Sequence, residues 1–343
     1  MTCGSMYYVY WFNKHYIVGA FKAFPDPVAK KLRRALYYSN ISESPKDAVR
    51  YYREALAVAE QVGMDPYSDE VIGIKVQLAA FLEKINQIQQ SIAILNLTRD
   101  ECLKWFEEGK GREEGEARRR RMLRKLVGMS VKIGELCQHY YVQSPEMAQR
   151  NFDWAVTSAL MAKNRQDEEK VETEAGTWLT EEEIGATLEA AATFYSQIGQ
   201  SHLAAPLFLE AIELCPKSDC NVVYLMNGLA VALASNTPSQ EAGTHAPDRA
   251  VMIDSARQWA NKALELAGNI KPPDRTEKCD TGCATVVQNL GQMAESEGNL
   301  AEARRRFEEA KSLSKAISHK VGVDLATESL ARLDEAADVK DNT

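Results

Sequence analysis

Residues 185–218 read GATLEAAATFYSQIGQSHLAAPLFLEAIELCPKS, with small and aromatic residues at helical spacings. Ala204, Phe208 and Ala211 are separated by four and three residues, so they lie on one face of a predicted helix. Ala192, twelve residues before Ala204, lies in a second helix, and a glycine between them interrupts the two. Because small side chains let helices approach closely, the stretch predicts two antiparallel helices in tight contact.

The same small–aromatic–small pattern recurs along the chain. Its complete copies are Ala48, Tyr52 and Ala55; Ala148, Phe152 and Ala155; Ala204, Phe208 and Ala211; and Ala303, Phe307 and Ala310. A copy at Ala256, Ala260 and Ala263 lacks the aromatic residue, and one at Ser91, Leu95 and Thr98 is degenerate. The copy at 185–218 adds Tyr195 in its first helix and Pro216 after its second, while Gly291 takes the place of Ala192 in the last copy. Six copies of one helix–turn–helix pattern predict a repeat protein.

The period of 34 residues is typical of the tetratricopeptide repeat (TPR). We therefore expect an all-α, right-handed α-solenoid of about six TPR units. The expected units are 1 and 2 within 25–106, 3 at 126–162, 4 at 185–218, 5 at 219–268 and 6 at 284–317. Between and around them we expect an aromatic juxtamembrane or packing segment at 1–24, a charged linker and helix start at 107–125, an acidic linker at 163–184, an inserted loop at 235–249, a loop at 269–283 and a capping helix at 318–335.

Composition argues against nucleic acid as a partner. The net charge is −8, whereas a phosphate-binding protein needs an excess of Lys and Arg. Basic residues do cluster at 30–34 and 118–125, and we interpret both clusters as solvated helix faces.

The amino-terminal stretch 6–24 is rich in Tyr, Trp and Phe but is interrupted by Asn13, Lys14 and His15. It is therefore too polar for a membrane-spanning helix, and it lacks the parts of a signal peptide. Two interpretations stay open: a first helix packed on the repeats, or a juxtamembrane segment whose anchor lies upstream.

Three blocks of sequence resemble one known family: Phe24–Tyr38, Tyr51–Ala59 and Gly63–Glu70. The family is the fungal TPR adaptor subunit of the mitochondrial inner-membrane i-AAA protease. The resemblance implies a TPR domain in the intermembrane space, tethered to the inner membrane, that delivers unfolded proteins to the protease. The implied partners are that protease, a companion adaptor subunit and unfolded polypeptide substrates. The family's presequence and full anchor have no counterpart in residues 1–24, so we expect attachment through a segment upstream.

Nothing in the sequence predicts catalysis, a metal or a cofactor. The carboxylates fall in runs that we interpret as solvated, and the five His residues are scattered. Cys102 and Cys137 lie on apolar helical stretches and are expected to be buried. Cys215, Cys220, Cys279 and Cys283 lie at expected loops or helix ends, where they could pair in an oxidising compartment. For Cys279 and Cys283, a plain loop or one structural bridge is favoured over a redox pair.

A TPR groove is lined by the first helix of each repeat, which gives candidate peptide-binding residues. Lys30 and Arg33 are the cations at such positions, too few for a clamp around a terminal carboxylate. Apolar side chains at lining positions of the second and fifth repeats have two interpretations, inter-repeat core or an apolar groove for unfolded segments. These residues are Val76, Ala80, Val222, Leu225 and Leu229.

The pattern and the resemblance together predict a non-enzymatic adaptor that binds unfolded or misfolded mitochondrial proteins and recruits them to the i-AAA protease. The alternatives are a TPR module of a mitochondrial import receptor or co-chaperone, and a structural scaffold of a membrane complex.

Overall fold

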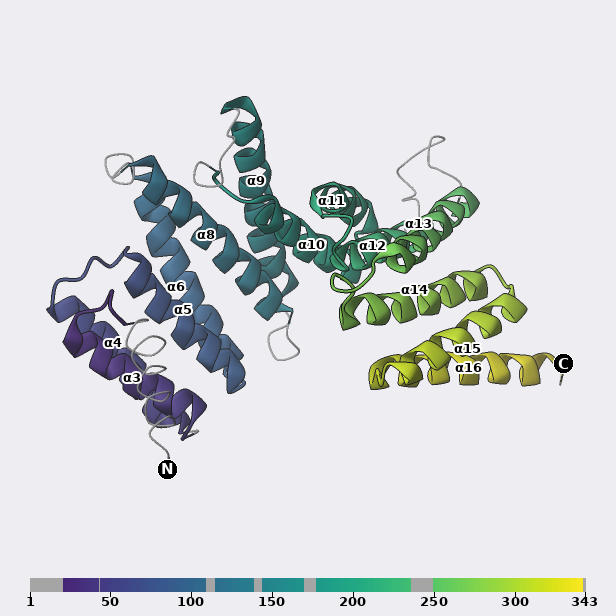
Figure 1. The fold of residues 1–343 in the computed structure, drawn as a ribbon, viewed down its shortest axis with the longest axis horizontal. Helices are drawn as coiled ribbons and strands as arrows, with labels where there is room; N and C mark the ends of the chain where they lie inside the picture. The colour runs from purple at the N-terminus through teal and green to yellow at the C-terminus, as the bar shows by residue number, and fades with distance from the viewer. Residues whose placement is uncertain are drawn as a thin grey trace. The chain divides into compact units, whose positions relative to one another are not determined.

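The computed structural model describes residues 21–42, 44–108, 115–138, 144–169, 177–235 and 249–341. Within these ranges all regular structure is helical (Figure 1). The helices are α3 (Asp26–Asn40), α4 (Pro45–Gln61), α5 (Asp69–Lys84), α6 (Ile88–Glu107), α8 (Glu116–Cys137), α9 (Pro145–Glu169), α10 (Glu181–Gln197), α11 (Ser201–Leu214), α12 (Asn221–Ser235), α13 (Arg249–Asn269), α14 (Glu277–Ser296), α15 (Leu300–Ala316) and α16 (Lys320–Asp341). The expected aromatic segment up to residue 20, and the inserted loop from 236 to 248, lie outside the described residues.

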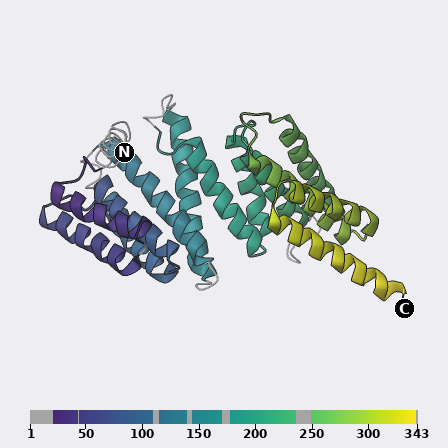
Figure 2. The same cartoon turned by 60° about the horizontal axis from the view of Figure 1, so that its bottom comes forward.

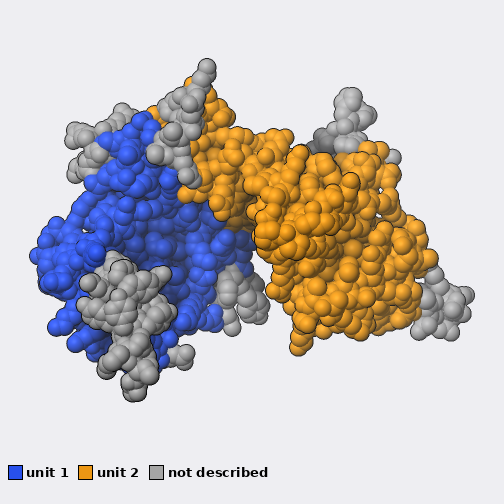
Figure 3. All heavy atoms as spheres, in the orientation of Figure 1, with its two compact units in different colours: residues 1–151 blue, residues 152–343 orange. Residues whose placement is uncertain are grey.

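The chain divides into two compact units, residues 1–151 and 152–343 (Figure 3). In unit 1, α3 packs on α4, α5 on α6, and α6 on α8. In unit 2, the pairs are α10 with α11, α12 with α13, and α14 with α15, and α16 covers α15 at the carboxyl end (Figure 2). These pairs are mostly neighbours in sequence, which is the all-α TPR architecture predicted from the repeats.

The residues of the repeated pattern form the cores of the helix pairs. Each Ala and aromatic residue of the four complete copies is buried, with at most 5% of its surface exposed. These residues are Ala48, Tyr52, Ala55, Ala148, Phe152, Ala155, Ala204, Phe208, Ala211, Ala303, Phe307 and Ala310. Ala192 and Tyr195 are equally buried, whereas Pro216 is exposed just after the end of α11. The pattern is therefore a packing signature in all four copies.

Two of these cores show how the pattern packs. The Phe152 ring stacks on the ring of Phe194 in α10, with 5.1 Å between their centres. Ala310 on α15 packs with Val287 on α14 and Ala326 on α16. The aromatic residue thus fills the space toward the next helix, and the small residue admits a close neighbour.

The small residues of the first helices leave space for aromatic rings of the second helices. A Cβ added to Gly228 or Gly291 would approach the ring of Phe208 or Phe307, respectively, to 2.5 Å. These positions therefore need a residue without a side chain, because the ring of the facing helix occupies the place of the Cβ.

The turn inside a helix pair needs a residue with a positive φ angle. Gly199 and Gly298 occupy it in the fourth and sixth pairs, each with φ of 77°. Asn86 takes the same position in the second pair, with φ of 60°. Asn is one of the few other residues that tolerate this conformation, which explains how the turn survives without glycine.

Two predicted loops are shorter in the structure. Helix α9 continues to Glu169, into the expected linker at 163–184, because its last turns have tertiary partners. The Gln166 side-chain oxygen accepts hydrogen bonds from the backbone N–H groups of Trp178 and Leu179, at 2.7 and 2.8 Å. Helix α14 begins at Glu277, inside the expected loop at 269–283, where Cys279 forms a disulfide with Cys220, the residue before α12.

Candidate functional site

The candidate residues of unit 1 are exposed. Val76 and Ala80 lie one turn apart on α5, and Val76 is 37% exposed. Lys30 and Arg33 lie exposed on α3, where the Arg33 guanidinium is 5.4 Å from the centre of the Phe21 ring. Unit 1 therefore presents a small apolar face on α5 and a separate basic face on α3.

The candidate residues of unit 2 are buried. Val222, Leu225 and Leu229 on α12 are at most 2% exposed, and Val222 packs in the core with the Ala residues of α13. Of the two interpretations for these side chains, the structure corresponds to inter-repeat core. A ligand cannot reach Val222 or Leu229 unless the helices separate.

Unit 2 nevertheless contains a groove of about 830 Å³, lined by the starts of α10 and α12, the end of α11 and Lys278 at the start of α14. Helices α10, α12 and α14 are the first helices of three successive pairs, the position that sequence analysis assigned to a peptide groove. Its apolar lining is Gly185, Ala186, Ala211, Leu214, Pro216 and Leu225. Ala211 and Leu225 are buried and form its base, whereas Ala186 is exposed. The volume falls within the range of ligand-binding pockets, roughly 300–1,000 Å³.

The residues of the TPR signature are almost all separate from this groove. All residues of the TPR signature lie in the described part of the chain. Among them, Ala211 and Pro216 line the groove. The others belong to the helix-pair cores and include Ala55, Phe152, Ala155 and Ala310, each at most 1% exposed. They hold their own helix pairs together and do not line the groove.

A capping box fixes the edge of the groove at the start of α10. The Thr180 hydroxyl accepts a hydrogen bond from the Glu183 N–H at 3.1 Å, and the Glu183 carboxylate accepts one from the Thr180 N–H at 2.8 Å. These reciprocal bonds satisfy two backbone donors and start the helix at a defined residue. Glu181 and Glu182, in the first turn, are thereby held exposed beside the groove.

A chain of hydrogen bonds joins the three helices that line the groove. The Asn221 amide on α12 donates to the Glu189 carboxylate on α10 at 2.8 Å. The Lys278 ammonium on α14 donates to the Asn221 side-chain oxygen at 2.5 Å. Because each bond has one charged partner, the network is expected to resist relative motion of the three helices.

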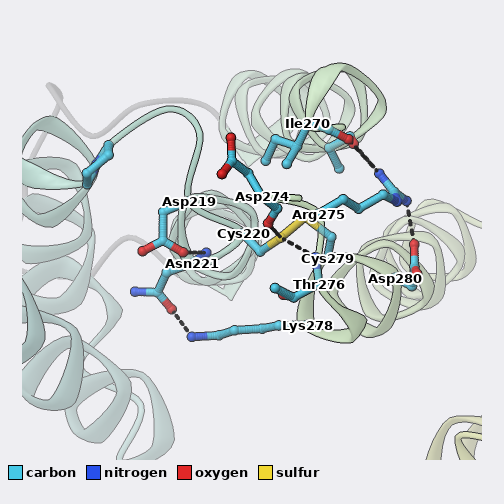
Figure 4. The surroundings of a disulfide bond; sticks show 12 residues. Asp219, Cys220, Asn221, Ile270, Asp274, Arg275, Thr276, Lys278, Cys279 and Asp280 are labelled. Carbon is cyan, nitrogen blue, oxygen red and sulfur yellow. Dashed lines mark hydrogen bonds and ion pairs between the residues drawn. A yellow bond between two sulfur atoms is a disulfide. The ribbon is translucent and has the colours of Figure 1, made fainter. Parts of the chain in front are cut away.

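A disulfide between Cys220 and Cys279 lies beside this network (Figure 4). The two residues are 59 apart in sequence, and their Cα atoms are 4.8 Å apart. Asn221 follows Cys220 and Lys278 precedes Cys279, so the bond ties together two helix starts that line the groove. Cys279 is therefore one half of a structural bridge, with Cys220 rather than Cys283 as its partner.

The thiol that borders the groove is not activated. Burial raises the pKa of Cys215 to about 11, with further contributions from Asp219 and Glu189. At neutral pH the side chain is thus a thiol, not the thiolate that a nucleophile or metal ligand requires. Within the described ranges, no group of three or more His, Cys, Asp or Glu side chains is placed to hold a metal ion.

The basic cluster at 118–125 is used inside unit 1. Arg121 and Lys125 form ion pairs with Asp69 at the start of α5, and the Arg118 guanidinium lies 5.0 Å from the centre of the Trp105 ring. Burial opposes ionisation of Asp69, but the Lys125 hydrogen bond and the positive charges of Lys125, Arg121 and Arg118 hold the pKa of Asp69 below its ordinary value. The interpretation as a merely solvated face was incomplete, because these cations join α8 to α5.

Sequence reasoning missed the carboxylates of the groove, since Glu181 and Glu182 were assigned to a solvated acidic linker. The Thr-x-x-Glu pattern at 180–183 was the available signal, because it places a helix start at that point. No helix in the described part of the chain is both long and apolar enough to cross a bilayer.

Comparison with known proteins agrees with the fold. The chain is 28% identical over 324 residues to a TPR repeat-containing protein of Schizosaccharomyces pombe, covering 92% of this chain and 81% of that protein. It is 27% identical over 135 residues to the protein MRG3-like of Saccharomyces cerevisiae, covering 38% of this chain and 27% of that protein. The crystal structure of BtubC from P. vanneervenii superposes with a TM-score of 0.53 at 13% identity, covering 80% of this chain and 92% of that one. No family model matches the chain.

These findings agree with the all-α TPR solenoid that the helix pairs form. Its repeats are of the kind that stack into extended surfaces for binding other proteins.

Proposed function

We propose that this chain is a non-enzymatic adaptor that binds unfolded or misfolded mitochondrial polypeptides and recruits them to the inner-membrane i-AAA protease. The observation that carries the binding step is the groove of unit 2, which lies at the starts of the first helices of three successive repeats, beside the end of α11, and has accessible apolar lining at Ala186, Leu214 and Pro216. Such a groove fits an extended segment with exposed side chains, which unfolded chains offer and native proteins do not.

The recruitment step rests on the resemblance of residues 24–70 to the protease adaptor family. It follows mass action: weak capture of a segment raises its effective concentration at a protease held nearby. In this proposal the TPR domain faces the intermembrane space, attached to the inner membrane through a segment upstream of the repeats. The protease and a companion adaptor subunit are the expected partners.

The binding step is tested by blocking the groove. Ala186 is exposed and lines it, so Ala186→Trp fills the groove without entering the core. Ala301→Trp is the matched control, because Ala301 is exposed on α15 and does not line the groove. We expect wild type and the control to retain a chemically unfolded model protein in a pull-down and Ala186→Trp to lose it. Circular dichroism checks that all three proteins fold. Equal retention of native and unfolded protein would refute the binding step.

The recruitment step is tested with the purified i-AAA protease and the same unfolded protein. Wild type is expected to accelerate its degradation and Ala186→Trp is not. Binding without any effect on degradation would instead favour an import receptor or co-chaperone. Absence of both would favour a structural scaffold.

A further inference from the structure

The groove of unit 2 carries an unequal set of charges. Glu181, Glu182, Glu189 and Asp219 line it, against Lys278 as the one lining cation among the described residues. Four carboxylates and one ammonium group give these side chains a net charge of −3. The carboxylates come from α10 and from the segment before α12, so folding gathers them around one cavity.

The partners of these charges differ. Glu189 and Lys278 both bond to Asn221 and are therefore occupied. Asp219 accepts a local hydrogen bond from the Asn221 N–H at 2.8 Å, which leaves its charge uncompensated by a cation. Among the described residues, Glu181 and Glu182 have neither an ion-pair partner nor a side-chain hydrogen bond. Three carboxylates thus face the groove with their charge available to a ligand.

The helix amino termini at the groove contribute positive partial charge, which opposes the negative charge of the carboxylates. Three helix amino termini meet at the groove, and each carries roughly half a positive charge. The two carboxylates in the first turn of α10 more than offset the partial charge of that helix. The partial charges at the starts of α12 and α14, together with the ammonium group of Lys278, are smaller in sum than the negative charge of Asp219, Glu189 and the excess on α10. The groove therefore keeps a net negative charge. An anionic ligand, such as a terminal carboxylate, is therefore disfavoured.

We propose that the groove selects cationic segments, in which Lys or Arg side chains flank apolar residues. The accessible apolar lining, Ala186, Leu214 and Pro216, takes the apolar side chains, while Glu181, Glu182 and Asp219 pair with the cations. The inference rests on the proposed function, because it names which unfolded polypeptides the groove accepts. Since the carboxylates are exposed, the selectivity is electrostatic and falls as salt rises.

The test uses the full chain and three unstructured peptides with the same apolar residues, which differ only in carrying Lys, Gln or Glu at the intervening positions. Fluorescence anisotropy measures the dissociation constant of each. Wild type is expected to bind the Lys peptide most tightly, with affinity that falls as sodium chloride is raised. Glu181→Gln/Glu182→Gln is expected to weaken binding of the Lys peptide by about threefold to tenfold, as two exposed ion pairs are lost. It should leave binding of the Gln peptide unchanged.

Two further variants make the result specific. Glu265→Gln/Glu308→Gln removes the same charge from exposed positions on α13 and α15 outside the groove, and should leave the preference intact. Glu181→Lys/Glu182→Lys is expected to transfer the preference to the Glu peptide. Equal affinity for all three peptides, abolished by Ala186→Trp, would refute the charge selectivity while the binding function stands. Failure to bind any of them, or any unfolded protein, would refute the proposed function itself. A preference for Lys that survives Glu181→Lys/Glu182→Lys would place the selective site elsewhere.

Discussion

Replacing Gly228 with Ala tests the close approach of α11 and α12 in unit 2. The added Cβ would lie 2.5 Å from Cζ and 2.6 Å from Cε1 of Phe208. Phe208 is only 4% exposed, so its ring has little room to move. Overpacking of this kind costs about 1–3 kcal/mol, whereas replacing Gly by Ala within a helix contributes roughly 1 kcal/mol of stability. The two effects together predict a net loss of about 0–2 kcal/mol.

The effect of Gly228→Ala on the free energy of unfolding should change sign when the Phe208 ring is removed. Phe208→Ala alone should destabilise by about 3–5 kcal/mol, because it leaves a cavity in the core. In that background the Cβ at position 228 has space, so Gly228→Ala should stabilise by roughly 1 kcal/mol through helix propensity. The double-mutant cycle should therefore show a coupling free energy of about 1–3 kcal/mol.

The measurement is urea unfolding followed by circular dichroism, comparing midpoints at unchanged slope. Gly185→Ala is the control in the same unit, because its nearest neighbour, Leu214 Cβ, would be 3.9 Å from the new Cβ. It should stabilise by roughly 1 kcal/mol. An equal loss from Gly228→Ala in both backgrounds would show that contact with the Phe208 ring is not the cause. A gain in the wild-type background would refute the close approach of α11 and α12.

Three further predictions concern the disulfide, pH and a buried thiol. Closing a loop between cysteines 59 residues apart stabilises by about 4 kcal/mol in the chain-entropy model, so Cys220→Ala/Cys279→Ala should melt at a lower temperature. Dithiothreitol should lower the wild-type midpoint and leave that variant unchanged; a wild type insensitive to reductant would contradict this. The hydrogen bond from Arg305 is the main cause that lowers the pKa of Glu302 from 4.5 to about 2. Its contribution to stability is thus present above pH 4.5 and lost as pH falls toward 2, so Glu302→Gln should flatten the melting profile over that interval. Burial raises the pKa of Cys102 to about 11, so iodoacetamide at about pH 8 should label it only after unfolding; rapid labelling of the native protein would refute its burial.

The fold was predictable because a TPR encodes its packing locally. Ala204 and Phe208 are on one helical face, and a glycine with positive φ five positions before Ala204, and again before Ala303, marks the turn. These spacings are short, so the sequence alone indicates which side chains meet. The ends of α9 and α14 were not predictable in this way. They depend on the contacts of Gln166 with Trp178 and on the bond to Cys279.

The residues of the candidate site were not predictable: of the seven candidate groove residues, Leu225 alone lines the groove of unit 2. Sequence placed the groove along the first helices of the repeats, and the structure has a groove there in unit 2. It could not distinguish a lining side chain from a buried one, and Leu229 proved to be fully buried. A side chain that lines the groove and one that is buried can lie a single helical turn apart. Contact with the neighbouring helix determines which of the two is covered.

The sequence by itself determined the helical repeat, the pairing of successive helices and the small residues at their crossings, because these depend on contacts between residues close together in the chain. Only the tertiary structure decided which charges share one cavity. Glu181, Asp219 and Lys278 are far apart in sequence, and each has an ordinary local explanation as a helix-end residue. They form one charged groove because stacking aligns the starts of successive first helices, an arrangement fixed by the packing of whole repeats rather than by any local pattern.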